Sequence, residues 1–145
     1  MTPSLENQAI SAAIPPSHRD LFDKKCTAYL ACWLAGGSLP VNPVWCALVD
    51  GRVVINSAEG RLKDKAMRRD GRVTLCVTDP DNAFRYLEIR GRVEEVTSED
   101  AGKTIDRMAE RYLGVNVYPN RAPGMVRVNY WIAPEKVAAF PIQRS

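Results

Sequence analysis

The residues best suited to binding a ligand lie in one segment, residues 56–64, with the sequence NSAEGRLKD. A strand-like run ends there, Ser57 can cap a helix, and a basic helix is predicted to follow. The unpaired N–H groups and positive dipole end of a helix N-terminus suit a phosphate. Arg61 would bind it as a two-pronged fork and Lys63 as a point charge, while Gly60 would let the backbone approach closely. The segment therefore predicts a phosphate-binding site.

Charge is concentrated around this segment. Residues 58–72 hold six basic and three acidic side chains, and this excess of three equals the net charge of +3 of the whole chain. One interpretation is a solvated helix face with ion pairs between residues four apart. The other is an anionic ligand, and the local pattern leaves both open. The basic residues are Arg61, Lys63, Lys65, Arg68, Arg69 and Arg72.

Several other chemistries lack their motifs. The chain has no GxSxG, GxxxxGK[ST] or GxGxxG pattern, and its one histidine, His18, is expected at the surface. The four cysteines have no CxxC spacing, and three lie in apolar runs, so buried free thiols are expected rather than a zinc site or disulfides. Glu94 and Glu95 are adjacent in a predicted strand, which would place them on opposite faces and argues against a paired-carboxylate site.

The elements expected to position the phosphate segment are mostly strands. Three helices are predicted, over residues 17–25, 58–69 and 98–114. Ser17 and Ser57 are expected to cap the first two, and Gly114 to end the third. The apolar stripe of the second helix would consist of Ala58, Leu62 and Ala66. Strands are predicted over 27–35, 39–49, 52–56, 73–78, 84–96, 125–132 and 136–140, with Asp50-Gly51 as a hairpin turn and Pro134 as a break. Six or seven antiparallel strands with few helices favour a small barrel.

The length and composition indicate one globular domain. The chain has 145 residues, of which 46% are hydrophobic and 26% charged. We expect a flexible N-terminal segment over 1–16 and the domain over 17–145. No apolar run reaches the roughly 20 residues that span a bilayer, and the N-terminus does not resemble a signal peptide, so a cytoplasmic location is expected.

Several runs, taken in order, make the chain similar to a known superfamily. NPVW at 42–45, INSAEGRLKD at 55–64, RRD at 68–70 and RVTL at 72–75 resemble the pyridoxamine 5′-phosphate oxidase-like superfamily, most closely its branch of deazaflavin (F420)-dependent enzymes. The pattern continues through DP at 79–80, RYLEIRGRV at 85–93, RYLG at 111–114, YPNRAPG at 118–124 and RV at 127–128. The resemblance covers roughly residues 21–137.

The resemblance implies a fold and a cofactor site. The fold would be mainly β with short helices, a six-stranded antiparallel split β-barrel, with the cofactor in a groove between the subunits of a homodimer. Arg61 and Lys63 would meet the cofactor phosphate, with Asn56, Ser57 and Gly60 nearby. The ring system would lie against Pro43, Val44 and Trp45, and the basic helix, including Arg68, would face the acidic tail of a deazaflavin. No catalytic side chain is predicted, because the ring itself carries out the redox chemistry.

The chain also departs from the family pattern. It has Ala66-Met67 where members usually carry Asn-Leu, and Gly71 where they carry Pro. Trp33 stands in a segment that often reads Ala-Thr-Leu, and two roles stay open for it, a core residue or a wall of the substrate pocket.

The resulting functional prediction is a reductase that uses coenzyme F420 to transfer a hydride to a small unsaturated or quinone-like substrate. The alternatives are an FMN-dependent oxidoreductase of the same fold, and a protein that binds flavin or deazaflavin without turnover. A nucleic-acid-binding barrel is disfavoured, because the basic residues gather on one helix and the aromatic ones are expected to be buried. These aromatic residues are Trp45, Phe84, Tyr86 and Trp131. Neither a metal site nor a membrane partner is expected.

Overall fold

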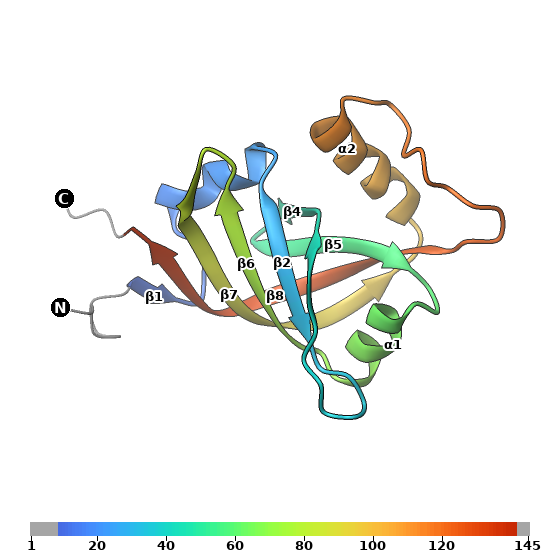
Figure 1. Ribbon diagram of the computed structural model, residues 1–145, viewed down its shortest axis with the longest axis horizontal. Helices are drawn as coiled ribbons and strands as arrows, with labels where there is room; N and C mark the ends of the chain where they lie inside the picture. Colours follow the sequence, from blue (N-terminus) through green and yellow to red (C-terminus); the bar gives the residue numbers. More distant parts are fainter. Residues whose placement is uncertain (1–8, 142–145) are drawn as a thin grey trace.

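One curled antiparallel sheet dominates the computed structural model, which describes residues 9–141 (Figure 1). Seven strands follow one another in the order β3-β2-β6-β7-β8-β5-β4, and β1 pairs with β8 beside this path. The strands are β1 (Ala9–Ser11), β2 (Thr27–Cys32), β3 (Val41–Val44), β4 (Cys46–Val49), β5 (Arg52–Ala58), β6 (Arg72–Asp79), β7 (Asn82–Thr97) and β8 (Arg127–Phe140). The mainly β, antiparallel class is confirmed, whereas the implied count of six strands is wrong for the described residues.

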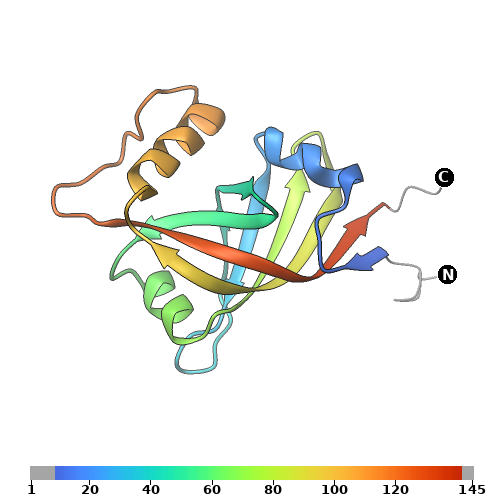
Figure 2. The same cartoon turned by 180° about the vertical axis from the view of Figure 1, so that it is seen from behind.

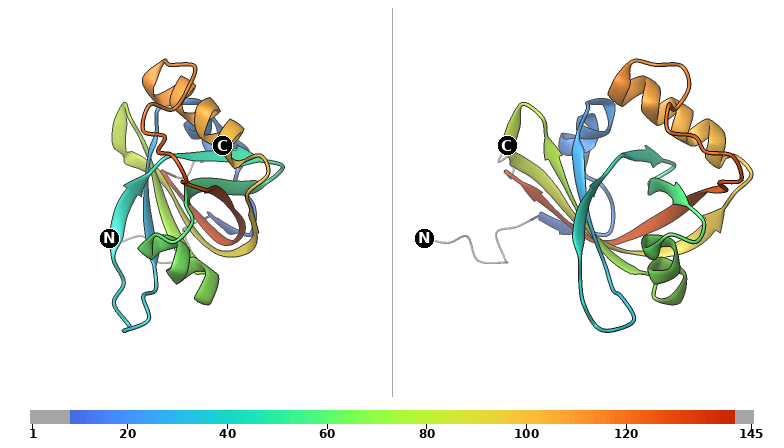
Figure 3. Two further views of the ribbon diagram at one scale, coloured as in Figure 1. Left: turned by 90° about the vertical axis from the view of Figure 1, so that its right-hand side faces the viewer. Right: turned by 45° about the vertical axis from the view of Figure 1, so that its right-hand side comes forward.

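The split in the barrel lies at Trp45. The single strand predicted over 39–49 is in fact two strands, because β3 pairs with β2 while β4 pairs with β5. β3 and β4 are therefore the two edges of the sheet, joined in the chain by Trp45 but not paired with each other, and the sheet curls between them (Figure 3). Pro43 lies in edge strand β3, where no further neighbour requires its missing N–H.

The turn between β4 and β5 matches its prediction. Asp50 has φ 51° and Gly51 has φ 81°, so both central residues are left-handed, as a type I′ hairpin requires. Val49 consequently pairs with Arg52, and this register brings Asn56 and Ser57 to the far end of β5.

The long strands β7 and β8 contain two irregularities that the sequence reading missed. Pro134 lies opposite Gly91 at a register shift, so β8 passes through it without the predicted break (Figure 2). A Cβ on Gly91 would lie 2.5 Å from the Ala133 carbonyl oxygen, which explains the glycine. A second shift leaves Glu94 outside the register, and both Glu94 and Glu95 contact Arg52 at 3.1 and 3.0 Å. The prediction of opposite faces for these two carboxylates was therefore wrong.

The core fills the concave side of the sheet, and a short 3-10 helix, η2 (Pro16–Asp23), closes one end with Leu21 and Phe22. Ser17 does not cap η2. His18 is buried, contrary to the prediction, because η2 packs its ring inward, where Nε2 lies 3.0 Å from the Phe140 carbonyl oxygen and Nδ1 lies 2.8 Å from Ser17 Oγ.

Two α-helices lie on either side of the β5–β8 end of the sheet, α1 (Leu62–Arg69) and α2 (Ala101–Leu113) (Figures 1 and 2). Ser57 does not cap α1, because β5 continues to Ala58 and Ser57 pairs with Val128. Leu62 is 66% exposed, so the predicted apolar stripe through it is also wrong. α2 ends as predicted, at Gly114, with φ 71°.

Exposure corrects further expectations about the aromatic residues and one expectation about the thiols, since Cys76 is not fully buried. Phe84 is 79% exposed rather than buried, and Trp33 is 36% exposed, which places it outside the core. All four cysteines are free, and Cys76 alone is partly exposed.

Described structure begins before the predicted domain boundary at residue 17. Ala9–Ser11 pair with β8 and Ile14 belongs to the core, while residues 1–8 lie outside the described part. Within residues 9–141, no helix is long and apolar enough to cross a membrane.

Candidate functional site

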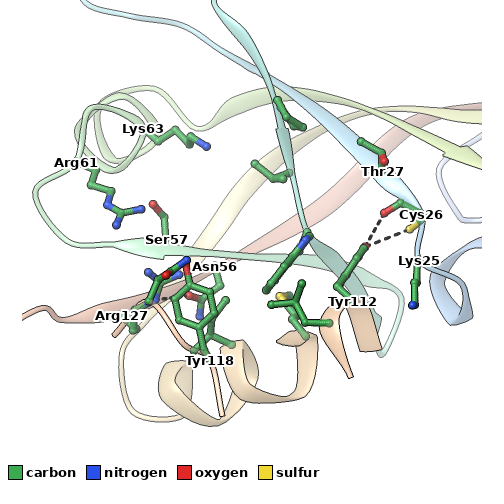
Figure 4. Close-up of a pocket in the computed structure, with 17 residues that line it drawn as sticks. Lys25, Cys26, Thr27, Asn56, Ser57, Arg61, Lys63, Tyr112, Tyr118 and Arg127 are labelled. Atoms are coloured by element: carbon green, nitrogen blue, oxygen red, sulfur yellow. Dashed lines mark hydrogen bonds between the residues drawn. The ribbon is translucent and has the colours of Figure 1, made fainter. Parts of the chain in front are cut away.

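A pocket of about 530 Å³ lies beside the split in the barrel (Figure 4). Its walls come from four places: the chain entering β2, the β3–β4 junction, the β5–α1 segment, and α2 with the loop that leads to β8. Seven of the nine predicted cofactor-binding residues line it, namely Pro43, Val44, Trp45, Asn56, Ser57, Arg61 and Lys63. Gly60 and Arg68 do not.

The pocket has a basic end formed by Arg61, Lys63 and Arg127, which we call the pocket cations. None of the three forms an ion pair with a carboxylate of residues 9–141. Burial lowers the pKa of Lys63 and that of Arg127, because each side chain loses water without gaining an acid. The Ser57 side chain projects from β5 toward Arg61 and Lys63 (Figure 4). An anion bound here would supply the missing counter-charge.

The turn that carries Arg61 is held by a buried carboxylate, Asp64. It accepts hydrogen bonds from the Tyr130 hydroxyl at 2.6 Å, Arg68 Nε at 2.8 Å and the Gly60 N–H at 2.9 Å. Burial opposes ionisation of Asp64, but these three donors outweigh it, and its pKa lies below the ordinary value. Gly60, with φ 88°, thus serves the turn, and Arg68 is held away from the pocket.

Asn56 holds Arg127 in place. Its amide nitrogen donates to the Ala101 carbonyl at 2.9 Å and to Asn129 Oδ1 at 2.8 Å, and its amide oxygen accepts from Arg127 Nε at 2.8 Å. The Arg127 guanidinium also lies over the Tyr118 ring, 5.2 Å from its centroid. The amide of Asn56 is therefore engaged within the protein, and its role at the site is to orient a neighbour.

The other end of the pocket is aromatic. The rings of Trp45 and Tyr112 stack with centroids 5.0 Å apart and planes 4° from parallel, and Tyr118 meets Trp45 edge-on at 5.9 Å. The Tyr112 hydroxyl donates to the Cys26 carbonyl at 2.7 Å, and burial raises the pKa of Tyr112. Flat aromatic walls of this kind suit a planar ring system.

Sequence reasoning missed part of this pocket. Tyr112, Tyr118 and Arg127 stand in the family-like runs, but the sequence gives none of them a role at the site. Arg127 reaches the site because it pairs with Ala58 across β5 and β8. That pairing joins segments about 70 residues apart, and the sequence carries no local signal for it.

The fold and pocket together define a split-barrel protein able to bind a planar, anionic ligand. The family comparison agrees, since the model of the pyridoxamine 5′-phosphate oxidase family matches residues 14–140. The chain therefore belongs to this family, as its motifs indicated. Among curated proteins, no sequence matches this chain significantly.

Solved structures with the same fold support the placement. The chain is similar to an F420 reductase at 26% identity, with a TM-score of 0.75, over 86% of this chain and 98% of that one. It also shares its fold with a conserved hypothetical protein of Mycobacterium tuberculosis, at 21% identity and a TM-score of 0.65 over 93% and 94% of the two chains. A third is HupZ of Group A Streptococcus, at 17% identity and a TM-score of 0.63 over 88% and 94%.

Proposed function

We propose that this protein is an oxidoreductase that binds coenzyme F420 in the pocket and reduces a small unsaturated or quinone-like substrate. The observation that carries the proposal is that three cations without an acidic partner among residues 9–141 share one pocket of about 530 Å³ with a stacked aromatic wall. A phosphorylated tricyclic cofactor has this combination of charge and flatness. The 26% identity to an F420 reductase supports the choice of deazaflavin.

The residues of the pocket fit such a cofactor. Arg61, Lys63 and Arg127 would hold its phosphate, with the Ser57 hydroxyl as a further donor. Pro43, Val44 and Trp45 would lie along the ring system, and Met108 and Ile105 would keep water from it. When bound, the deazaflavin ring supplies the hydride. The protein's part is to bind, orient and shield, and no side chain is assigned a proton-transfer step.

FMN is the second candidate, and a specific observation favours it. The acidic tail of F420 needs cations outside the phosphate site, yet Arg68 is paired with Asp64 and Arg69 donates to the Trp33 carbonyl. Of the basic side chains that follow Lys63 on α1, only Lys65 has no ion-pair or hydrogen-bond partner within the described residues. FMN has no such tail, so the paired helix weakens the charge argument for F420 and leaves the family likeness to support it.

We also propose that the functional form is a homodimer. Tyr29 and Val41, which are 42% and 62% exposed, lie on adjacent strands β2 and β3 with Pro43, and this apolar face borders the pocket. A second copy packed there would cover the face and complete the groove. Light scattering should give about twice the 16.1 kDa chain mass, and Val41→Asp should give a monomer. A wild-type monomer that binds cofactor tightly would contradict this.

The deciding experiment measures F420 and FMN binding side by side. Purified apoprotein is titrated with each cofactor, and turnover is then followed by loss of reduced F420 with a quinone acceptor. Tighter binding of F420 with turnover supports the proposal. Tighter binding of FMN moves the function to a flavin enzyme, and tight binding of either without turnover over a panel of quinones and enones makes the protein a carrier or sensor.

A further inference from the structure

Two thiols lie behind the aromatic end of the pocket. Cys26 Sγ and Cys46 Sγ are 3.9 Å apart, both residues are completely buried, and neither is in a disulfide. Cys26 lines the pocket and Cys46 does not, so Cys26 is the thiol nearer to the pocket interior. Cys46 follows Trp45 directly in the chain. One thiol of the pair therefore borders the pocket, and the other is bonded in the chain to Trp45 at the split in the barrel.

The surroundings of the two thiols differ in a way that suits a dithiol reaction. The Tyr112 hydroxyl lies 3.5 Å from Cys26 Sγ, and the Arg111 guanidinium donates to the Cys46 carbonyl. The hydrogen bond between the thiols lowers the pKa of Cys26 and raises that of Cys46, with Arg111 favouring both thiolates. Cys26, which also lines the pocket, is thus the better placed of the two to attack, with Cys46 as the second thiol.

We propose that Cys26 and Cys46 form a redox-active dithiol, which peroxide converts to an intramolecular disulfide. The Cys26 thiolate attacks one oxygen of hydrogen peroxide, the O–O bond breaks, and the leaving hydroxide takes a proton to become water. The Cys46 sulfur then attacks the resulting sulfenic acid, and the departing hydroxide takes the Cys46 proton. Overall, two thiols and one peroxide give one disulfide and two waters, and each sulfur loses one electron.

Closing this disulfide would act on the aromatic wall. Bonded sulfurs are about 2.05 Å apart, so the two must approach by roughly 2 Å. Cys46 would draw Trp45 with it, and the Cys26 carbonyl, which accepts the Tyr112 hydroxyl, would move on the other side. The Trp45–Tyr112 stack therefore lies between the two displacements. This inference concerns the thiols themselves and holds whichever cofactor the pocket takes.

The test counts thiols and weighs the protein after exposure to hydrogen peroxide. The denatured wild type should fall from four thiols to two and lose two hydrogens in mass, with Cys26 and Cys46 in one cross-linked peptide. Dithiothreitol should restore all four thiols. Cys76→Ser, the matched control on β6, should still lose two thiols, whereas Cys26→Ala should form no intramolecular disulfide.

A second measurement, near-ultraviolet circular dichroism, detects changes in the aromatic wall and needs no cofactor. Oxidation should change the near-ultraviolet circular dichroism of the wild type and of Cys76→Ser, and leave that of Cys26→Ala unchanged. Because the wild-type mass and thiol count need no variant, a variant that fails to fold does not affect them. Retention of four thiols by the wild type, or a disulfide through Cys32 or Cys76, would overturn the proposal. So would an unchanged dichroism spectrum after the disulfide has formed.

Discussion

Two groups of basic residues lie near the two ends of α1, and they differ in what surrounds them. Arg68 and Arg69 at the end of α1 and Arg72 at the start of β6 each have a protein partner. Arg68 pairs with Asp64 at 2.8 Å, Arg72 pairs with Asp70 at 2.7 Å, and Arg69 donates to the Trp33 carbonyl oxygen at 2.6 Å. The pocket cations have no acidic partner among residues 9–141. A count of charges along the sequence cannot separate the two groups. They differ in whether their charges are already compensated, and therefore in how strongly each would bind an anion.

Lys63 and Arg127 are half-buried, whereas Arg68, Arg69 and Arg72 are exposed, so the two groups differ in their energetic roles. An exposed ion pair such as Arg72–Asp70 contributes little to stability, because water screens it and the side chains lose freedom. Lys63 is partly buried and uncompensated, so its charge has a cost that a bound phosphate removes. The molecule thus places its neutralised cations on the surface and its uncompensated ones in a pocket, as a site for an anionic ligand requires.

The largest effect is expected from removing two pocket cations. The Arg61→Ala and Lys63→Ala double variant should bind either cofactor more weakly, by roughly tenfold to a hundredfold for each charge-assisted hydrogen bond lost, since each contributes about 1.5–3 kcal/mol. The thermal midpoint of the apoprotein should stay nearly unchanged. Isothermal titration calorimetry measures the affinity, and Arg72→Ala is the matched control. Equal losses in both variants would erase the distinction between the two groups.

A second test addresses the third pocket cation through the residue that orients it. Asn56→Leu removes the acceptor of Arg127 Nε and the donor that Asn56 supplies to Asn129 Oδ1 and to the Ala101 carbonyl. Cofactor binding should weaken by about tenfold, and the free energy of unfolding should fall by about 1–3 kcal/mol. Urea denaturation and calorimetry separate the two effects. A stable variant with wild-type affinity would show that Arg127 needs no support from Asn56.

How far the sequence predicts this site depends on how local each feature is. Seven pocket residues were predicted because their signals are contiguous runs, 43–45 and 56–63. The Asp50-Gly51 turn and the Gly114 helix end were likewise predicted, since each depends on two or three residues with particular φ angles. The fold class followed from alternation, which reports the two faces of a strand.

Features that depend on distant segments were missed. Pro43 and Trp45 were read as one strand with Cys46, because the sequence does not say that the chain crosses between two sheet edges there. Ser57 was read as a helix cap because its pairing with Val128 is invisible locally. The same limit hid Arg127. The Asp64–Arg68 pair, by contrast, joins residues four apart and agrees with the interpretation of this segment as a helix face with ion pairs.

The third prediction concerns Asp64, which links the two groups. Its pKa is depressed in the folded protein, so the stability it contributes is present above the unfolded value near 3.9 and is lost as pH falls through the folded pKa. Asp64→Asn should therefore lower the thermal midpoint at pH 7, and the difference from wild type should shrink below about pH 4. Arg68→Gln is the control, because it keeps the carboxylate. A difference independent of pH would mean that the Asp64 charge is not what matters.

The smallest effect is expected from reversing charge on the helix face. Lys65→Glu adds a negative charge without disturbing the Asp64–Arg68 pair, so it changes the field along α1 and not the turn that carries Arg61. If the acidic tail of F420 follows this face, its affinity should fall a few-fold at low salt, in keeping with the roughly 0.2–1 kcal/mol of exposed pairs. The loss should disappear at about 1 M salt, where screening acts within about 3 Å. FMN has no tail and should bind both forms equally, which makes it the internal control. An equal loss for both cofactors would place the effect at the phosphate, and no loss for F420 would mean that its tail follows another path.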